Sequence, residues 1–261
     1  MKPIIAILLF SLASSCSSHR TPNYDISEDD LIVVLNFKEY SRNQIGEQLQ
    51  KLSQKNPTVV GIDAGFFENK EPKGDSILLE GLMSLRDKVV IGCSIAGWEK
   101  NIARINFPAS IFLKKGIVVG HYYYSYDSLG NWFQKPYLPT DSVEQTMMTS
   151  FAHSVATLYD DKKSLEYINI FNERRMIKNK TILIKTGDEY PSFDLMDVEK
   201  IPEGSLSGKI MLLGYTGPSN EDKKRTTLRH KMETPDPLDT YGVYIIANQI
   251  EQILRGEIGM D

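Results

Sequence analysis

Three acidic residues, Asp63, Asp75 and Asp222, stand in predicted loops, where a carboxylate can bind a ligand. Asp63 follows the apolar segment 58–62 directly, and ligands of open α/β sheets gather at the carboxyl ends of strands. The three acids have no fixed spacing, and hard cations need several oxygen ligands, so no metal or cofactor is expected. We predict that Asp63, Asp75 and Asp222 bind the ligand. The alternative for each acid is a structural role, in which the carboxylate accepts hydrogen bonds from backbone N–H groups.

A hydrolase is the other chemistry that the sequence supports. The segment Gly92-Cys93-Ser94-Ile95-Ala96 resembles the strand-to-helix turn that exposes a serine nucleophile, with Ser94 as the nucleophile. It departs from that pattern at Ala96, where the pattern has a second glycine. Cys93 lies in an apolar run, where a lone cysteine is usually a small buried hydrophobe. An envelope hydrolase that uses Asp63 or Ser94 is therefore one alternative function.

The N-terminus resembles a bacterial lipoprotein signal. Lys2 supplies a positive charge, residues 4–12 form an apolar run too short to span a bilayer, and small residues precede Cys16. We predict that residues 1–15 are a signal peptide, that Cys16 is lipidated after cleavage, and that residues 16–30 are a tether. This places the protein in the cell envelope, anchored to a membrane and facing the periplasm. A plain secretory signal with an incidental cysteine is the alternative.

The composition excludes several classes of protein. The chain has 261 residues, 41% of them hydrophobic and 25% charged, with a formal net charge of −4. A chain of this length can bury a core of its own, which excludes disordered, collagen-like and disulfide-rich classes. A mildly acidic chain also lacks the basic footprint of a nucleic-acid binder, so no nucleic-acid partner is expected.

The elements that must position these residues follow an alternating pattern. Short apolar runs predict strands at residues 31–37, 58–62, 89–94, 116–124, 181–185 and 209–213. Apolar residues at spacings of three and four predict helices at residues 41–55, 75–85, 142–159 and 241–254, with Asp75 as the N-cap of the second. Near-continuous apolar strands between helices favour one α/β domain with a mixed, largely parallel sheet flanked by helices. We assign this domain to residues 31–256, followed by a tail at 257–261.

These segments, in this order, resemble the type 2 CHASE domain (CHASE2), an extracellular sensor family associated with cyclases and histidine kinases. The residues that carry the resemblance are Gly61-Ile62-Asp63 with Phe66 and Glu68, Asp75 with Leu78 and Leu79, the turn around Asp127, Gly130 and Pro136, and, towards the C-terminus, Ser207-Gly208-Lys209-Ile210, Leu212-Leu213-Gly214, Asp222, Thr234-Pro235, Tyr241-Gly242-Val243, Ala247-Asn248 and Ile250. The resemblance covers roughly residues 31–256.

The resemblance implies a sensor that binds a small-molecule or protein signal and catalyses no reaction. Family members usually continue into membrane helices and a cytoplasmic effector, whereas this sequence stops at Asp261. We therefore expect the signal to pass to a separate signalling protein. The alternative within signalling is that the sequence is the sensor portion of a longer membrane receptor of the cyclase or histidine kinase type.

Overall fold

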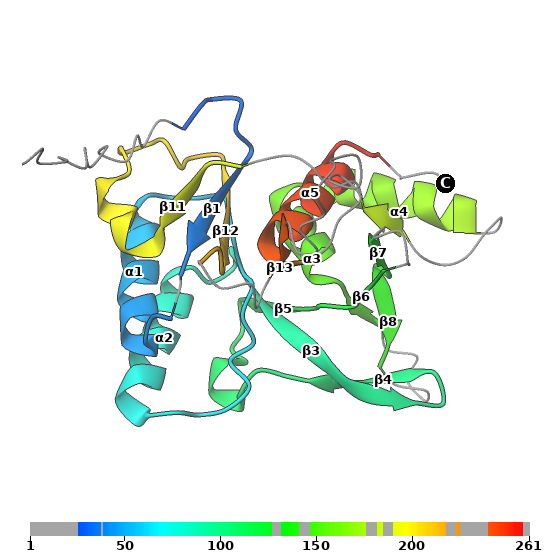
Figure 1. The fold of residues 1–261 in the computed structure, drawn as a ribbon, viewed down its shortest axis with the longest axis horizontal. Coiled ribbons are helices and arrows are strands. Elements are labelled where there is room, and N and C mark those ends of the chain that lie inside the picture. The colour runs from blue at the N-terminus through cyan, green and yellow to red at the C-terminus, as the bar shows by residue number, and fades with distance from the viewer. Residues whose placement is uncertain are drawn as a thin grey trace, which may run out of the picture.

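A sheet of seven strands runs through the middle of the molecule (Figure 1). The computed structural model describes residues 26–37, 39–126, 132–140, 147–175, 182–184, 190–217, 223–224 and 240–257. The strands of the sheet are β1 (Ile32–Asn36), β2 (Val59–Ile62), β3 (Val89–Glu99), β4 (Ile102–Asn106), β5 (Ile117–His121), β11 (Ser192–Asp194) and β12 (Ile210–Gly214). Their order is β11-β1-β12-β2-β3-β4, and β5 also pairs with β3. Every pairing is parallel except that of β3 with β4.

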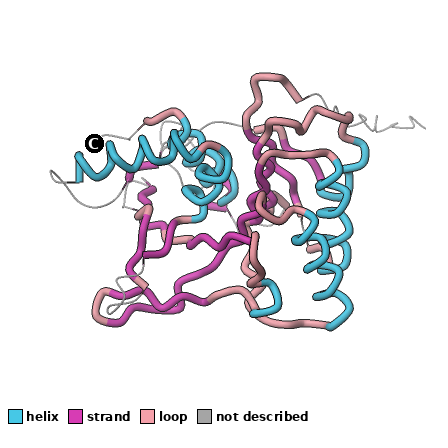
Figure 2. The backbone as a smooth tube through the Cα atoms, turned by 180° about the vertical axis from the view of Figure 1, so that it is seen from behind, coloured by secondary structure: helices cyan, strands magenta, loops and turns pink. Residues whose placement is uncertain are grey.

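Helices cover both faces of this sheet (Figures 1 and 2). On one face lie α1 (Arg42–Gln54) and α2 (Pro72–Ser84), and on the other lie α3 (Phe151–Tyr159) and α5 (Gly242–Leu254), with α4 (Asp161–Arg175) packed against α3 and α5. Because successive side chains of a strand point to opposite faces, β1 contributes side chains to two separate cores. Val33 and Leu35 lie beneath α1 and α2, whereas Ile32 and Val34 lie beneath α3 and α5. The predicted fold class, a mixed and largely parallel sheet flanked by helices, is confirmed.

The first two helices cross in backbone contact. Ser41 caps α1, because its hydroxyl accepts a hydrogen bond from the Gln44 N–H while the Gln44 side chain accepts one from the Ser41 N–H. A Cβ atom on Gly46 would lie 2.4 Å from the carbonyl oxygen of Ile77, and one on Gly81 would lie 2.4 Å from the carbonyl oxygen of Gly46. Glycine at these two positions therefore sets the distance between α1 and α2.

Smaller sheets lie beside the central one. A three-stranded sheet contains β6 (Tyr124–Tyr126), β7 (Trp132–Gln134) and β10 (Ile182–Ile184). Two pairs are formed by β8 (Tyr137–Pro139) with β9 (Met147–Thr149), and by β13 (Lys223–Lys224) with β14 (Thr240–Tyr241). Two 3-10 helices, η1 (Ser110–Phe112) and η2 (Leu195–Lys200), complete the described elements. No helix within the described residues combines the length and the apolar character needed to cross a membrane.

Two predicted helix starts are wrong. The helix predicted at residues 142–159 begins only at Phe151, where the Ser150 hydroxyl caps it, and Met147–Thr149 form a strand instead; residues 141–146 lie outside the described part. The second helix begins at Pro72, before Asp75, because a proline suits the first helical position. Asp75 is therefore not the N-cap, which is Glu71, but a residue of the first turn.

Candidate functional site

The carboxyl ends of three neighbouring strands bring polar residues to one edge of the sheet. Asn36 at the end of β1 pairs with Gly214 at the end of β12. Asp63 follows β2, and its N–H donates a hydrogen bond of 2.7 Å to the carbonyl oxygen of Leu213. This is the edge at which ligands of open α/β sheets bind. The predicted position of Asp63 at the end of a buried strand is correct.

Two tyrosines from the segment after β5 accompany Asp63. The Tyr122 hydroxyl donates a hydrogen bond of 3.0 Å to the carbonyl of Ile62, and the Tyr124 hydroxyl donates one of 3.2 Å to Oε1 of Gln249 on α5. Burial raises the pKa of both phenols well above the usual value, and the carboxylate of Asp63 raises the pKa of each further. Both hydroxyls are therefore protonated near neutral pH. We call Asp63, Tyr122, Tyr124 and Gln249 the edge cluster.

The loop after β12 lies at the same edge and is fixed from two sides. The Thr216 N–H donates a hydrogen bond of 3.0 Å to Oδ1 of Asn36, which is buried. The Tyr241 hydroxyl, at the start of α5, donates one of 2.5 Å to the carbonyl of Gly217. These bonds hold the backbone of the loop against the end of β1 and the start of α5, so the position of the loop at this edge is fixed. These edge residues come from elements far apart in the chain, so no single motif of the sequence groups them with Asp63.

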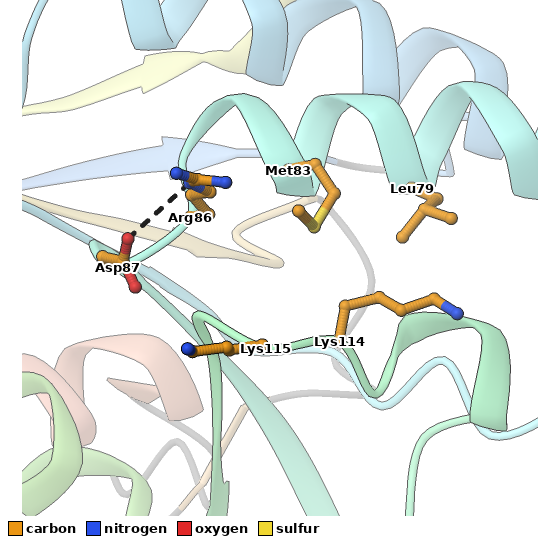
Figure 3. A pocket seen from close by; sticks show the side chains of 6 residues that line it. All are labelled: Leu79, Met83, Arg86, Asp87, Lys114 and Lys115. Atoms are coloured by element: carbon orange, nitrogen blue, oxygen red, sulfur yellow. Dashed lines mark ion pairs between the residues drawn. The ribbon is translucent and has the colours of Figure 1, made fainter.

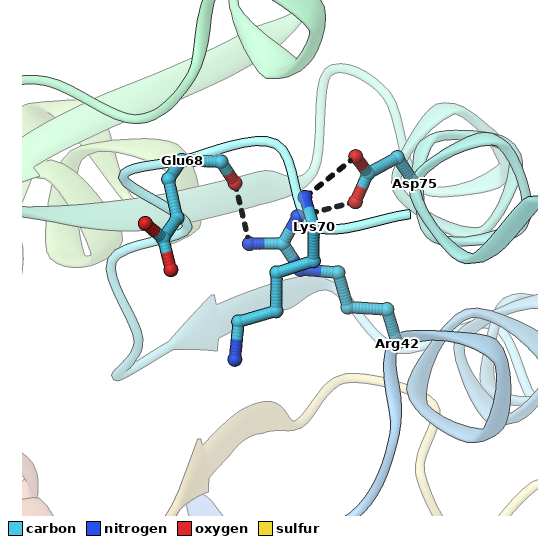
Figure 4. Close-up of polar contacts among 4 residues, drawn as sticks. All are labelled: Arg42, Glu68, Lys70 and Asp75. Carbon is cyan, nitrogen blue, oxygen red and sulfur yellow. Dashed lines mark hydrogen bonds and ion pairs between the residues drawn. The ribbon is translucent and has the colours of Figure 1, made fainter. Parts of the chain in front are cut away.

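Asp75 lies on the face of the sheet that α1 and α2 cover, in a buried ion pair with Arg42 (Figure 4). The side chains are only 4% and 8% exposed. The second carboxylate oxygen accepts a hydrogen bond of 3.0 Å from the Lys70 N–H, and the Arg42 guanidinium donates another of 2.7 Å to the carbonyl of Glu68. The same guanidinium also lies over two aromatic rings, 5.8 Å from the centroid of Phe66 and 5.4 Å from that of Phe112. The arrangement ties α1 to the loop before α2.

A surface hollow of about 610 Å³ lies at the other end of the strands (Figure 3). Leu79 and Met83 of α2 form its apolar side. Its charged side comes from the turns that precede β3 and β5, and consists of Arg86, Asp87, Lys114 and Lys115. Arg86 and Asp87 form an exposed ion pair of 3.7 Å. The hollow is thus apolar on one side and mainly cationic on the other, and it is distant from the carboxyl edge because it adjoins the strand starts.

The comparisons with known proteins give one family. A family model described as the CHASE2 domain matches residues 25–260. The chain belongs to the CHASE2 domain family. This family consists of extracellular sensor domains, in agreement with the resemblance of the sequence. No curated protein and no solved structure matches the chain.

The predicted ligand-binding residue Asp222 lies outside the described residues. So do the predicted lipidation site Cys16 and the predicted signal peptide at 1–15. The structure separates the other two predicted ligands, since Asp63 lies beside Tyr122 and Tyr124, whereas Asp75, in the first turn of α2, is buried against Arg42 of α1. Across the described ranges, no group of three or more His, Cys, Asp or Glu side chains is placed to hold a metal ion.

Ser94 of the CHASE2 domain does not occupy a nucleophile turn. It lies inside the continuous strand β3 and pairs with Asn106 of β4. A serine nucleophile of the hydrolase type needs a sharp strand-to-helix turn that exposes its hydroxyl. Cys93 is fully buried, as predicted for a small hydrophobe, and burial raises the pKa of its thiol to about 12. A thiol in this state is protonated and is not a nucleophile.

Proposed function

We propose that the protein is a lipoprotein, anchored through Cys16, whose CHASE2 domain faces the periplasm and binds a signal without catalysing a reaction. The family supports a sensory role outside the cytoplasm, and the apolar run ahead of Cys16 supports the anchor. The observation that carries ligand binding is the edge cluster, in which a partly exposed carboxylate stands among neutral phenols at the carboxyl edge of a parallel sheet.

The chemistry of the edge cluster favours a ligand with hydrogen-bond donors. Asp63 is an acceptor, and the Oε1 atom of Gln249 already accepts from Tyr124. An amine or a polyhydroxylated ligand would match the carboxylate, and the phenol rings would pack on its apolar faces. The Tyr241 hydroxyl bonds the loop after β12 to the start of α5, so a ligand that moves one of them also moves the other. In this proposal the signal passes by changing the affinity for a separate signalling protein, since a lipid anchor transmits no movement across the membrane.

The test compares two variants that remove one carboxylate each. Asp63→Asn removes the charge of the edge cluster, whereas Asp87→Asn removes the acid of the surface hollow and keeps a residue that tolerates the positive φ of 66° at that position. Ligands are identified by thermal shift with a panel of amines and sugars and measured by titration calorimetry. We expect Asp63→Asn to weaken binding at least tenfold and Asp87→Asn to leave it unchanged.

The reverse result, with binding weakened by Asp87→Asn and intact in Asp63→Asn, would move the ligand site to the hollow. If the wild-type protein instead hydrolyses members of the panel, and Asp63→Ala or Ser94→Ala abolishes the turnover, the envelope hydrolase is the correct function.

The anchor is tested separately by the intact mass of the native protein extracted from membranes. We expect a species that begins at an acylated Cys16, and we expect Cys16→Ala to prevent the acylation. A heavier, unlipidated species that extends past Asp261 would favour the alternative of a longer membrane receptor.

A further inference from the structure

Three residues with soft or imidazole ligand atoms lie on three strands that contact one another. Cys93 is on β3, His121 on β5 and Met148 on β9. The Sγ atom of Cys93 lies 3.6 Å from the Sδ atom of Met148. Cys93 and His121 are paired residues of adjacent parallel strands, so their side chains point to the same face of the sheet. We call these three residues the sulfur–imidazole cluster.

The imidazole of His121 is the unexplained part of this cluster. Its exposed fraction is 0%, and neither ring nitrogen has a hydrogen-bond partner of normal geometry. The backbone of Met148 adjoins the ring, which places the imidazole beside the residue that also contacts Cys93. Buried polar atoms are nearly always paired, because an unpaired one costs about 1–3 kcal/mol. Even with the Met148 backbone beside the ring, this buried imidazole keeps at least one ring nitrogen without a hydrogen-bond partner, which points to a missing ligand.

We propose that Cys93, His121 and Met148 bind one monovalent copper ion. Thiolate and thioether sulfur are soft ligands that select Cu(I), and imidazole also suits copper. With a metal–sulfur distance of about 2.3 Å, the length of a zinc–thiolate bond, two sulfur ligands lie about 3.8 Å apart at a tetrahedral angle and about 4.0 Å apart at a trigonal one. The observed separation of 3.6 Å is close to the tetrahedral distance, so the two sulfurs need little movement to share an ion. Met148 is partly exposed, which gives the ion a route of entry.

The protonation states agree with this assignment. Burial lowers the pKa of His121 to about 4, so the imidazole is neutral near pH 7 and keeps a lone pair for the metal. Burial raises the pKa of the Cys93 thiol, so the proton leaves only as the ion binds. One Cu⁺ replaces one proton on sulfur, and neither copper nor sulfur changes its oxidation state. The resulting thiolate–copper unit has no net charge, which suits a buried site.

The experiment uses the full chain in detergent, without oxygen, and Cu(I) supplied in competition with the chelator bicinchoninate. We expect one equivalent of Cu(I) in the wild type, with two sulfur ligands and one nitrogen ligand in X-ray absorption. Cys93→Ser and Met148→Leu should each weaken binding at least tenfold. Met148→Leu conserves volume, so the fold is retained, and circular dichroism verifies this.

Two matched controls separate the cluster from other sulfur in the chain. Cys16→Ser removes the other cysteine, and Met147→Leu removes the exposed neighbour of Met148. Both should bind one equivalent with unchanged affinity. Binding that survives Cys93→Ser and Met148→Leu, binding that is lost in Cys16→Ser, or less than a tenth of an equivalent in the folded wild type would each overturn the proposal. A test of ligand binding at Asp63 is independent of these outcomes.

Discussion

At the scale of single residues, the buried ion pair of Arg42 and Asp75 makes a clear prediction. Both side chains are shielded from water, so removing one partner leaves the other charge buried and uncompensated. We expect Asp75→Ala to lower the free energy of unfolding by about 3–5 kcal/mol, measured by urea denaturation.

The exposed ion pair of Arg104 and Glu99 is the matched control. Its side chains are 67% and 58% exposed, and such pairs contribute about 0–1 kcal/mol. If Asp75→Ala destabilised the protein no more than Glu99→Ala, the Arg42 pair would not be the link between α1 and α2 that its burial indicates.

Two buried histidines predict how stability depends on pH. Burial lowers the pKa of His121 and of His153 from 6.5 to about 4. The unfolded chain therefore takes up protons below pH 6.5 while the folded chain does not, so stability is full above pH 6.5 and falls between pH 6.5 and 4. At pH 5 the loss is about 2 kcal/mol for each histidine.

The measurement is urea denaturation at pH 7 and pH 5, with His153→Gln as the comparison. The Nε2 atom of His153 is 3.0 Å from the Ser164 hydroxyl, and a glutamine amide retains a polar partner for that hydroxyl. In the variant, the difference in the free energy of unfolding between pH 7 and pH 5 should be about half of that in the wild type. Equal stability of the wild type at both pH values would show that the folded histidines titrate normally.

At the scale of elements, the crossing of α1 and α2 depends on glycine. Gly81→Ala on an open helix would stabilise by about 1 kcal/mol, because alanine is the better helix former. Here the new methyl group meets the carbonyl of Gly46 at 2.4 Å and forces the helices apart. We expect a net loss of about 1–3 kcal/mol in thermal or urea unfolding.

Gly97 provides the control for this crossing, because a Cβ atom built on it meets no atom within 4 Å. Gly97→Ala in β3 should change stability by less than about 0.5 kcal/mol, as ordinary surface substitutions do. If Gly81→Ala raised the free energy of unfolding, the two helices would have moved apart without a loss of stability, and the close crossing would not depend on glycine.

The elements also differ in how well the sequence predicts them. The strand runs at 31–37, 58–62 and 209–213 match β1, β2 and β12 closely, because a strand buried on both faces is apolar throughout. The helix α4 was not predicted, since its residues show little separation into polar and apolar faces. Met147–Thr149 fits a helical spacing in the sequence but forms β9, because Tyr137–Pro139 lies beside it as a pairing strand.

At the scale of the whole molecule, the parallel sheet creates two distinct ends. The edge cluster lies where the strands end, and the surface hollow lies where β3 and β5 begin. This separation is what allows the variants of Asp63 and Asp87 to distinguish the two sites.

The sequence by itself determined the α/β class, the family and the place of Asp63 at the end of a strand, because these depend on local apolar runs and on the order of short motifs. Only the tertiary structure decided which residues lie beside Asp63, Asp75 and Cys93. Tyr122 joins Asp63 from 59 positions away, and Arg42 reaches Asp75 across 33. The sulfur–imidazole cluster likewise arises from the pairing of β3 with β5 and the approach of β9. Such contacts are set by strand order and helix packing, which no local pattern of residues encodes.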